Sequence, residues 1–215
     1  MFRNRAEAAH LLARRFKGRE LHDPLVLAIP RGGVVTGAVL ARELCAELDV
    51  VFSRKLRAPG QPELAIGAVS EDGKVYLNPS AKAFLDLANE YIAGEQAYQL
   101  GEIARRKALF RAIRPQATIE GRSVIVTDDG IATGATMIAA LQVARAKDPF
   151  ELIVAVPVAS PDRLQEIRRR CDEVICMRAP STFWAIGQFY QDFAPVEDAE
   201  ALELLRATLP APQTA

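Results

Sequence analysis

Two adjacent carboxylates, Asp128 and Asp129, stand where an apolar run of the chain gives way to small and hydroxyl-bearing residues. The run before them, residues 124–127, is β-branched throughout, which is the composition of a buried strand. Alanine, threonine and glycine make up residues 132–136, just beyond the acids. Two acids and a small-residue loop at the end of a buried strand can hold a polar ligand, so we expect a binding site there.

The small-residue loop leads into a helix, because apolar residues recur at helical spacing from 135 to 147. Thr133 and Thr136 can cap its first turn, and Gly134 lets the backbone approach a ligand closely. The unpaired amides of that turn and the positive end of the helix dipole attract anions. The pattern therefore predicts a phosphate site.

Two known phosphate-binding patterns do not match this site. A P-loop places lysine and then serine or threonine after its last glycine, whereas Ala135 follows Gly134 and Ala38 follows Gly37. Neither loop has the Gly-x-Gly-x-x-Gly spacing of a dinucleotide-binding fold. Carboxylates also repel phosphate, so the ligand must carry hydroxyls or a metal beside its phosphate. A ribose 5-phosphate meets that requirement.

Residues 124–136 closely resemble the 5-phosphoribosyl 1-diphosphate (PRPP) binding motif of type I phosphoribosyltransferases. In that family the paired acids bind the ribose 2- and 3-hydroxyls, which the resemblance assigns here to Asp128 and Asp129. Gly130 stands where the family usually has an aliphatic residue, and Ala132 where it often has threonine. The resemblance assigns the 5-phosphate to the loop of Ala132, Thr133, Gly134, Ala135 and Thr136. The alternative is a solvated Asp-Asp-Gly turn after a strand.

A second strand, loop and helix occur nearer the N-terminus. Residues 25–29 form an apolar run that ends at Pro30, and residues 34–48 have helical spacing. In type I phosphoribosyltransferases the loop at this place binds the diphosphate of PRPP, which the resemblance assigns to Arg31, Gly32 and Gly33. Glycines allow unusual backbone geometry, and arginine offers several donors to phosphate oxygens. The alternative is an ordinary turn with a surface arginine.

Three cations follow the next apolar run. Arg54, Lys55 and Arg57 lead into a segment rich in proline and glycine, so residues 54–63 are expected to form a mobile basic loop. The family's catalytic lid lies in this region and closes over the diphosphate. The resemblance implies that role for these three cations, with Arg54 and Lys55 on the diphosphate itself. Solvated surface charge is the alternative.

Strands alternate with helices along the chain, which predicts an α/β fold with a doubly wound, mostly parallel sheet flanked by helices. We expect a single domain over residues 1–215, with the ligand at the carboxyl ends of the strands. The other expected elements are helices at 4–18, 161–170 and 198–208 and strands at 49–53, 64–70, 74–77, 152–158 and 173–177.

A helical stretch at 80–113, with a break at 93–94, exceeds what the family core needs. We interpret it as a helical insertion, about residues 80–114, that packs beside the sheet. Its basic residues Arg105 and Arg106 are interpreted as a solvated helix face. The alternative is that they reach a phosphate of the ligand in a neighbouring subunit.

Aromatic residues gather in the segment 179–195, which together with the final helix corresponds to the hood of type I phosphoribosyltransferases. In that family the hood binds the nucleobase, and the resemblance makes Phe183, Trp184 and Tyr190 the base-binding candidates. Core packing is the alternative role for these rings. The segment contains no residue pattern that distinguishes a purine, a pyrimidine or another acceptor.

The chain of 215 residues carries 27 basic and 27 acidic residues, so its net charge favours neither a nucleic acid nor a membrane as partner. Three cysteines without a Cys-x-x-Cys pair indicate reduced thiols, and no apolar run has the length of a membrane span. We expect a cytoplasmic protein whose partners are small molecules. Family members are commonly dimers, so the resemblance also implies a homodimer.

The resemblance implies an enzyme in which a nitrogenous base attacks the ribose anomeric carbon of PRPP and pyrophosphate leaves. Stabilising the leaving group is then the main catalytic task. Mg²⁺ is the implied cofactor, held through water at the two aspartates. No general base is evident, and Asp129 is a candidate by position only. The expected catalytic residues are Asp128, Asp129, Arg31, Lys55 and Arg57.

Two other classes of function stay open at this point. A PRPP-responsive regulator keeps the phosphate loop without catalysis, and some members of the superfamily regulate transcription. A phosphatase or a response-regulator-like domain would use Asp128 as a phosphoacceptor and would not need the loop at 133–136.

Overall fold

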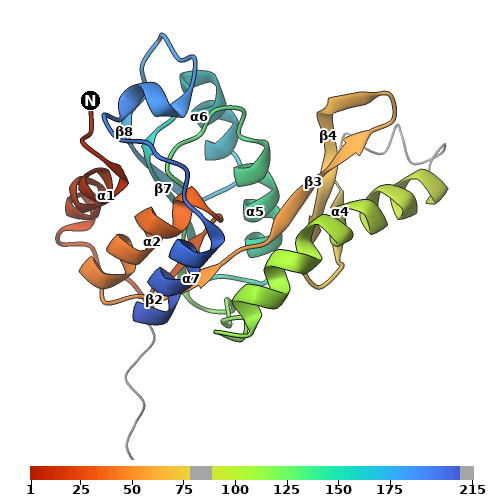
Figure 1. Ribbon diagram of the computed structural model, residues 1–215, viewed down its shortest axis with the longest axis horizontal. Helices are drawn as coiled ribbons and strands as arrows, with labels where there is room; N and C mark the ends of the chain where they lie inside the picture. Colours follow the sequence, from red (N-terminus) through yellow and green to blue (C-terminus); the bar gives the residue numbers. More distant parts are fainter. Residues whose placement is uncertain (78–88, 209–215) are drawn as a thin grey trace, which may run out of the picture.

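Five parallel strands form the centre of the molecule (Figure 1). A computed structural model describes residues 1–77 and 89–208, and its central strands run in the order β2-β1-β6-β7-β8. Their bounds are β1 Leu25–Ala28, β2 Glu47–Val50, β6 Ser123–Thr127, β7 Glu151–Val158 and β8 Glu173–Arg178. Every residue of β1 and β6 is buried, as expected for strands of a parallel sheet that is covered on both faces.

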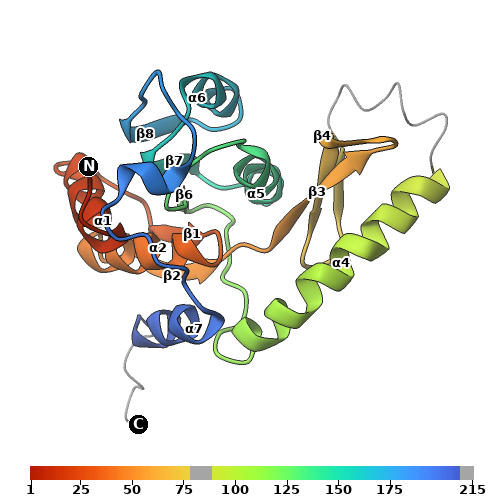
Figure 2. The same ribbon diagram turned by 45° about the horizontal axis from the view of Figure 1, so that its top comes forward.

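Helices cover both faces of this sheet, and the side chains of each strand alternate between the two layers (Figure 2). Val26 and Ile125 pack in one cluster with α1, α2 and α7, whereas Leu27 and Val126 pack with α5 and α6. The predicted doubly wound, mostly parallel α/β fold is confirmed. The bounds are α1 Arg5–Ala13, followed by the short helix η1 Arg14–Phe16, α2 Gly32–Glu43, α5 Ala135–Arg145, α6 Pro161–Arg168 and α7 Asp198–Ala207.

A three-stranded antiparallel sheet projects beside α5 (Figure 2). The prediction of a mobile basic loop at 54–63 is wrong. These residues pair in a hairpin that turns at Gly60 (φ 68°). Leu56 and Ala58 alternate with the basic residues and are buried, and this period-two pattern outweighs the local charge. The strands are β3 Ser53–Ala58, β4 Gln61–Ser70 and β5 Val75–Leu77.

Helix α4 (Asn89–Arg111) packs along β3 and β4 and reaches α7 at its C-terminal end (Figure 2). We call α4 and the antiparallel sheet the arm. The prediction that this helix packs beside the central sheet is wrong, because it packs against the arm strands and α7. The expected break at 93–94 is also wrong, because α4 runs on through Gly94. The expected start at residue 80 lies outside the described residues.

Helix α2 ends at Glu43, not at 48 as expected. Cys45 adopts a left-handed conformation (φ 50°), and the amide of Ala46 donates to the carbonyl of Ala41 at 2.8 Å. This turn satisfies a free carbonyl of the last helical turn and reverses the chain without a glycine or proline to mark it. The strand expected at 49–53 therefore begins earlier and ends at Val50.

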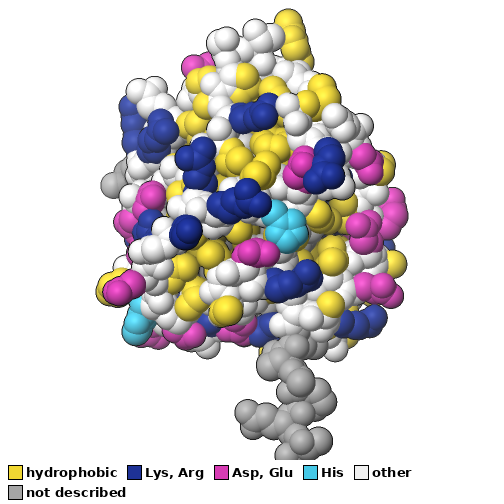
Figure 3. Space-filling view, turned by 90° about the vertical axis from the view of Figure 1, so that its left-hand side faces the viewer, with side chains coloured by type: hydrophobic (Ala, Val, Ile, Leu, Met, Phe, Trp, Pro, Cys, Tyr) yellow, Lys and Arg dark blue, Asp and Glu magenta, His cyan; other side chains and the backbone are white. Residues whose placement is uncertain are grey.

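The face that carries α1 mixes basic, acidic and hydrophobic side chains (Figure 3). This mixture agrees with the balanced formal charge of the sequence. In the part of the chain that the structure describes, no helix is long and apolar enough to cross a membrane.

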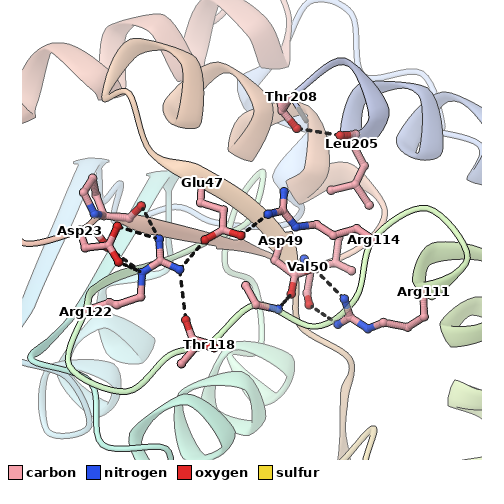
Figure 4. A network of polar contacts seen from close by, with 12 residues as sticks. Asp23, Glu47, Asp49, Val50, Arg111, Arg114, Thr118, Arg122, Leu205 and Thr208 are labelled. Atoms are coloured by element: carbon pink, nitrogen blue, oxygen red, sulfur yellow. Dashed lines mark hydrogen bonds and ion pairs between the residues drawn. The ribbon is translucent and has the colours of Figure 1, made fainter. Parts of the chain in front are cut away.

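A buried polar network joins the arm to the central sheet (Figure 4). Arg111, the last residue of α4, donates to Asp49 Oδ1 at 2.7 Å, to Glu71 Oε2 at 2.8 Å and to the carbonyl of Val50 at 3.0 Å. Asp49 is fully buried in β2, and Glu71 is 6% exposed at the end of β4. One guanidinium thus compensates two buried carboxylates from two different sheets.

We expect Arg111→Met to lower the free energy of unfolding by about 3–5 kcal/mol at pH 7, because it leaves two buried carboxylates without their cation. Arg105→Met is the matched control on the same helix, where the side chain is 73% exposed, and it should change stability by less than about 0.5 kcal/mol. Urea unfolding followed by circular dichroism measures both values. Equal effects of the two variants would contradict the role given to Arg111.

Candidate functional site

The two anion loops predicted from the sequence lie side by side at the carboxyl ends of β1 and β6. The amide of Ile29 donates to the carbonyl of Thr127 at 3.0 Å. A Cβ on Gly33 would lie 3.0 Å from the Cα of Asp128, so glycine lets the loops approach this closely. The peptide bond between Pro30 and Arg31 is cis. Adjacent strands of the parallel sheet thus bring together loops that are about ninety residues apart in the sequence.

The loop after β6 surrounds a cavity of about 150 Å³. Gly134 has a left-handed backbone (φ 77°) and precedes the first turn of α5, which leaves the free amides of that turn at the loop. Asp128 lies at the same cavity, and Ile186 of the short helix η3 (Ile186–Phe189) closes one side. Of the predicted phosphate loop, four residues line this cavity: Ala132, Thr133, Gly134 and Thr136.

A second cavity, of about 290 Å³, adjoins the first and shares Thr133 and Thr136 with it. Ala135, the remaining residue of the predicted phosphate loop, lines this second cavity. Four elements form its walls: the loop after β1 with Ile29 and Pro30, residues 51–55 with Arg54 and Lys55, α4 with Glu102, Ile103 and Arg106, and the start of α5. The structure therefore brings the predicted cations Arg54 and Lys55 to the phosphate loop.

The two aspartates have different partners. Asp128 lines the smaller cavity, and its Oδ1 accepts a hydrogen bond from the Asp129 amide at 2.8 Å. Asp129 instead accepts a hydrogen bond from Arg5 Nε at 2.7 Å, and both of these side chains are 11% exposed. The guanidinium of Arg5 also lies over the ring of Phe193, 3.8 Å from its centroid. One of the two predicted acids therefore faces the cavity, while the other is held in an ion pair beside it.

Burial raises the pKa of Asp128 well above its ordinary value of 3.8, and the neighbouring charge of Asp129 raises it further. Burial also raises the pKa of Asp129, but the ion pair with Arg5 opposes that shift. Tyr190 adds to the packing around the pair, since its hydroxyl donates to the carbonyl of Asp129 at 2.6 Å. Of the two acids, Asp128 is thus the one more readily protonated.

The predicted diphosphate loop adjoins the site, and Gly32 packs on Asp129. A Cβ on Gly32 would lie 2.0 Å from Asp129 Oδ2, so a larger residue would displace this carboxylate. Arg31 extends towards α7, where its Nη1 lies 3.4 Å from Glu197 Oε2. Its side chain lines neither cavity, although Pro30 before it does.

Arg57 is not brought to the site. Its guanidinium makes two hydrogen bonds to Glu95 of α4, at 2.7 and 2.9 Å, and lies over the ring of Tyr98. Glu95 in turn accepts a hydrogen bond from Gln99 at 2.9 Å. Arg57 therefore fastens β3 to α4 in this structure, which differs from the lid position expected for it.

The three aromatic candidates of the hood occupy three different environments. Phe183 is partly buried against Phe189, with ring centroids 5.1 Å apart, and Trp184 is 86% exposed. Tyr190 is 5% exposed and stacks on Phe193 at 4.9 Å, so it belongs to the core of the hood. The face of the Tyr190 ring is thus covered, which differs from the stacking surface expected of it.

The sequence did not single out Arg5, Glu102 or Ile186 as site residues. It gave Arg106 as a surface charge or as a contact to a neighbouring subunit's ligand, whereas the structure places it at a cavity of its own chain. Arg5 lies 124 positions from the carboxylate it binds, and no local spacing marks that contact. Glu102 and Arg106 are four positions apart and so share one face of α4. That spacing was the available signal, but it did not show which partner the face meets.

No group of three or more His, Cys, Asp and Glu side chains that could hold a metal ion occurs among the described residues. Mg²⁺ in proteins commonly keeps several waters and binds one or two carboxylates together with substrate phosphates. A lone carboxylate beside a phosphate loop, as at Asp128, fits an ion of that kind, carried in by a phosphorylated substrate. Asp129 fits less well, because Arg5 already occupies its carboxylate.

Comparison with known proteins identifies the family of this chain. The family model described as "Phosphoribosyl transferase domain" matches residues 3–194. The crystal structure of TT1426 from Thermus thermophilus is 42% identical, with a TM-score of 0.93, and the match covers 97% of this chain and 99% of that one. The chain therefore belongs to the phosphoribosyltransferase family.

Two curated relatives come from Mycobacterium tuberculosis. The protein Rv0571c of strain H37Rv and the protein MT0597 of strain CDC 1551, both provisionally named phosphoribosyl transferases, are each 39% identical to this chain over 205 residues. The alignments cover 95% of this chain and 46% of either relative. The chain thus spans about half the length of the curated relatives it matches.

We expect Asp128→Asn to raise the free energy of unfolding at pH 8, because it removes a charge that burial and the neighbouring Asp129 make unfavourable in the folded protein. The folded-state pKa of Asp128 is raised, so the folded protein holds this proton more tightly than the unfolded chain. Stability in the wild type therefore falls as pH rises from the unfolded pKa through the folded pKa.

Asparagine keeps the acceptor for the Asp129 amide and carries no charge, so its advantage should shrink towards pH 4 and disappear below both pKa values. Denaturant titrations at pH 4 and pH 8 measure the two differences. An advantage that is equal at both pH values, or a loss of stability at pH 8, would show that the Asp128 charge is not destabilising.

Proposed function

We propose that this chain transfers the 5-phosphoribosyl group of PRPP to a nitrogenous base and releases pyrophosphate. The observation that carries the proposal is the contact between the two cavities. Asp128 and most of the predicted phosphate loop line one cavity, and Arg54 and Lys55 line the other. Thr133 and Thr136 line both. PRPP carries its groups in the same order: a 5-phosphate, a ribose diol and a diphosphate.

The proposed reaction replaces one bond at the anomeric carbon by another. The bond to the diphosphate oxygen breaks, its electron pair leaves with pyrophosphate, and the base nitrogen forms the new bond and gives up its proton to solvent. A cation about 4 Å from the departing charge stabilises it by roughly 4 kcal/mol at an effective dielectric of about 20, which is about three powers of ten in rate. Leaving-group charge is therefore the quantity that the cations control.

The chain's residues divide these tasks. Asp128 accepts hydrogen bonds from the ribose hydroxyls, while the loop amides bind the 5-phosphate. Arg54 and Lys55 bind the diphosphate together with the amides at Gly32 and Gly33. Asp128 would hold Mg²⁺, and the ion would supply further positive charge for the leaving group. Asp129 acts indirectly, by fixing Arg5 and the backbone that precedes the phosphate loop.

The base is proposed to enter beside η3, where Ile186 borders the small cavity and Trp184 stands exposed on the loop before it. Gln188 accepts hydrogen bonds from the amides of Trp184 and Ala185 at 3.1 and 3.3 Å, which fixes this loop. An exposed indole on a fixed loop can stack on a flat heterocycle.

A PRPP-binding regulator without turnover is the second candidate. The observation in its favour is the place of Arg57, which lies in a bidentate ion pair with Glu95 and away from the cavities. Such a protein would bind PRPP with the same residues and would release no pyrophosphate.

Asp128→Asn is expected to weaken PRPP binding roughly tenfold or more, because it removes a charged acceptor for the ribose hydroxyls. The matched control is Asp148→Asn, an exposed aspartate in the turn before β7 whose left-handed backbone (φ 51°) asparagine tolerates. Calorimetric titration with PRPP and Mg²⁺ measures both affinities. Unchanged affinity in Asp128→Asn, or an equal loss in both variants, would refute the proposed site.

Turnover is tested separately by pyrophosphate release from PRPP with a panel of purine, pyrimidine and other nitrogen acceptors. Release that depends on one acceptor supports the transferase. Tight PRPP binding without release for any acceptor supports the regulator, and no PRPP binding rejects both.

A further inference from the structure

Helix α4 contributes a cation to the larger cavity that the sequence did not assign to it. Arg106 lines the same cavity as Arg54 and Lys55. Arg54 and Lys55 come from β3, while Arg106 comes from the helix that packs along that strand. The arm therefore presents basic side chains to the cavity from two of its elements.

Arg106 lies close to a carboxylate of another helix. Its Nε lies 3.6 Å from Asp198 Oδ1, and the neighbouring Arg105 lies 3.1 Å from Asp198 Oδ2. Arg105 is 73% exposed and lines no cavity described for this chain, whereas Arg106 is 33% exposed and faces the cavity. Two adjacent arginines thus share one anchor at the start of α7, and they differ in what they face.

The charge around the cavity fits a polyanion. Arg54, Lys55 and Arg106 line it together with one carboxylate, Glu102, which lies 3.6 Å from Arg54. Like charges brought together in a partly enclosed space repel one another, and an anion bound between them removes that repulsion. A diphosphate offers several acceptor oxygens over a length that can meet cations from two walls.

We propose that Arg106 is a diphosphate-binding residue, which contacts the leaving group of PRPP from the α4 side while Arg54 and Lys55 contact it from β3. The inference rests on the proposed function and adds the arm helix to the substrate site. Asp198 acts as a positioning residue, because it holds the Arg106 guanidinium at the cavity wall.

This role predicts that a change at Arg106 affects the affinities for two closely related ligands differently. Ribose 5-phosphate has the 5-phosphate and the diol but lacks the diphosphate, so Arg106 has nothing to bind in it. PRPP has all three groups. Loss of Arg106 should therefore weaken PRPP and leave ribose 5-phosphate unchanged, whereas general damage to the fold would weaken both.

The test compares Arg106→Gln with Arg105→Gln by calorimetric titration of each full-length variant with PRPP and with ribose 5-phosphate, both in the presence of Mg²⁺. Both variants remove one positive charge and one ion pair to Asp198, which makes Arg105→Gln the matched control. Arg106→Gln should weaken PRPP roughly tenfold or more and ribose 5-phosphate less than about twofold. Arg106→Lys, which keeps the charge, should restore part of the PRPP affinity.

Equal PRPP affinities in the two glutamine variants, or an equal loss of both ligands in Arg106→Gln, would overturn the inference. Wild-type protein that binds ribose 5-phosphate but gains no affinity from the diphosphate would overturn it as well. If wild-type protein binds neither ligand, the proposed function itself fails and the inference falls with it.

Discussion

The burial of two neighbouring carboxylates at the end of β6 is the constraint on which the site depends. Ionised groups in adjacent positions repel each other and lose hydration inside a protein, so such a pair needs a compensating cation. Arg5 supplies it to Asp129 at 2.7 Å, and the ion pair is largely shielded from solvent. Asp128 remains at the cavity wall, where its charge is costly to the fold and available to a ligand.

Several parts of the chain converge on that ion pair. Asn4 caps α1 by accepting a hydrogen bond from the Glu7 amide at 2.9 Å, which sets the start of the helix directly before Arg5. Tyr190 of the hood donates to the Asp129 carbonyl, and Gly32 of the diphosphate loop leaves room for the carboxylate. The N-terminus, the hood and the first anion loop are thus ordered around one side chain, which explains why the N-terminal helix belongs to the site and not merely to the core.

The arm holds the basic segment after β2 in a fixed place at the cavity. A free loop would carry its cations to the substrate only on closure, whereas the hairpin already holds Arg54 and Lys55 at the cavity. The Arg57–Glu95 pair and the Arg111 network join the strands to α4 and α4 to the central sheet. Ion pairs between separate elements define the relative position of those elements, and a defined position is what a cation needs to stabilise charge on a leaving group.

The sequence alone determined the parallel α/β fold, the two anion loops and the small-residue cradle, because these follow from local patterns: apolar strands, helical spacing, and glycines at strand ends. The resemblance to type I phosphoribosyltransferases implied that Arg54 and Lys55 act on the same ligand as Asp128, but as part of a mobile lid and not of a hairpin. Only the tertiary structure decided that the two aspartates have different partners, that Arg57 pairs with Glu95 of α4, and that Arg5 and Arg106 reach the site. The physical reason is that these contacts join side chains from separately formed elements, and their partners depend on how helices pack and not on any spacing along the chain.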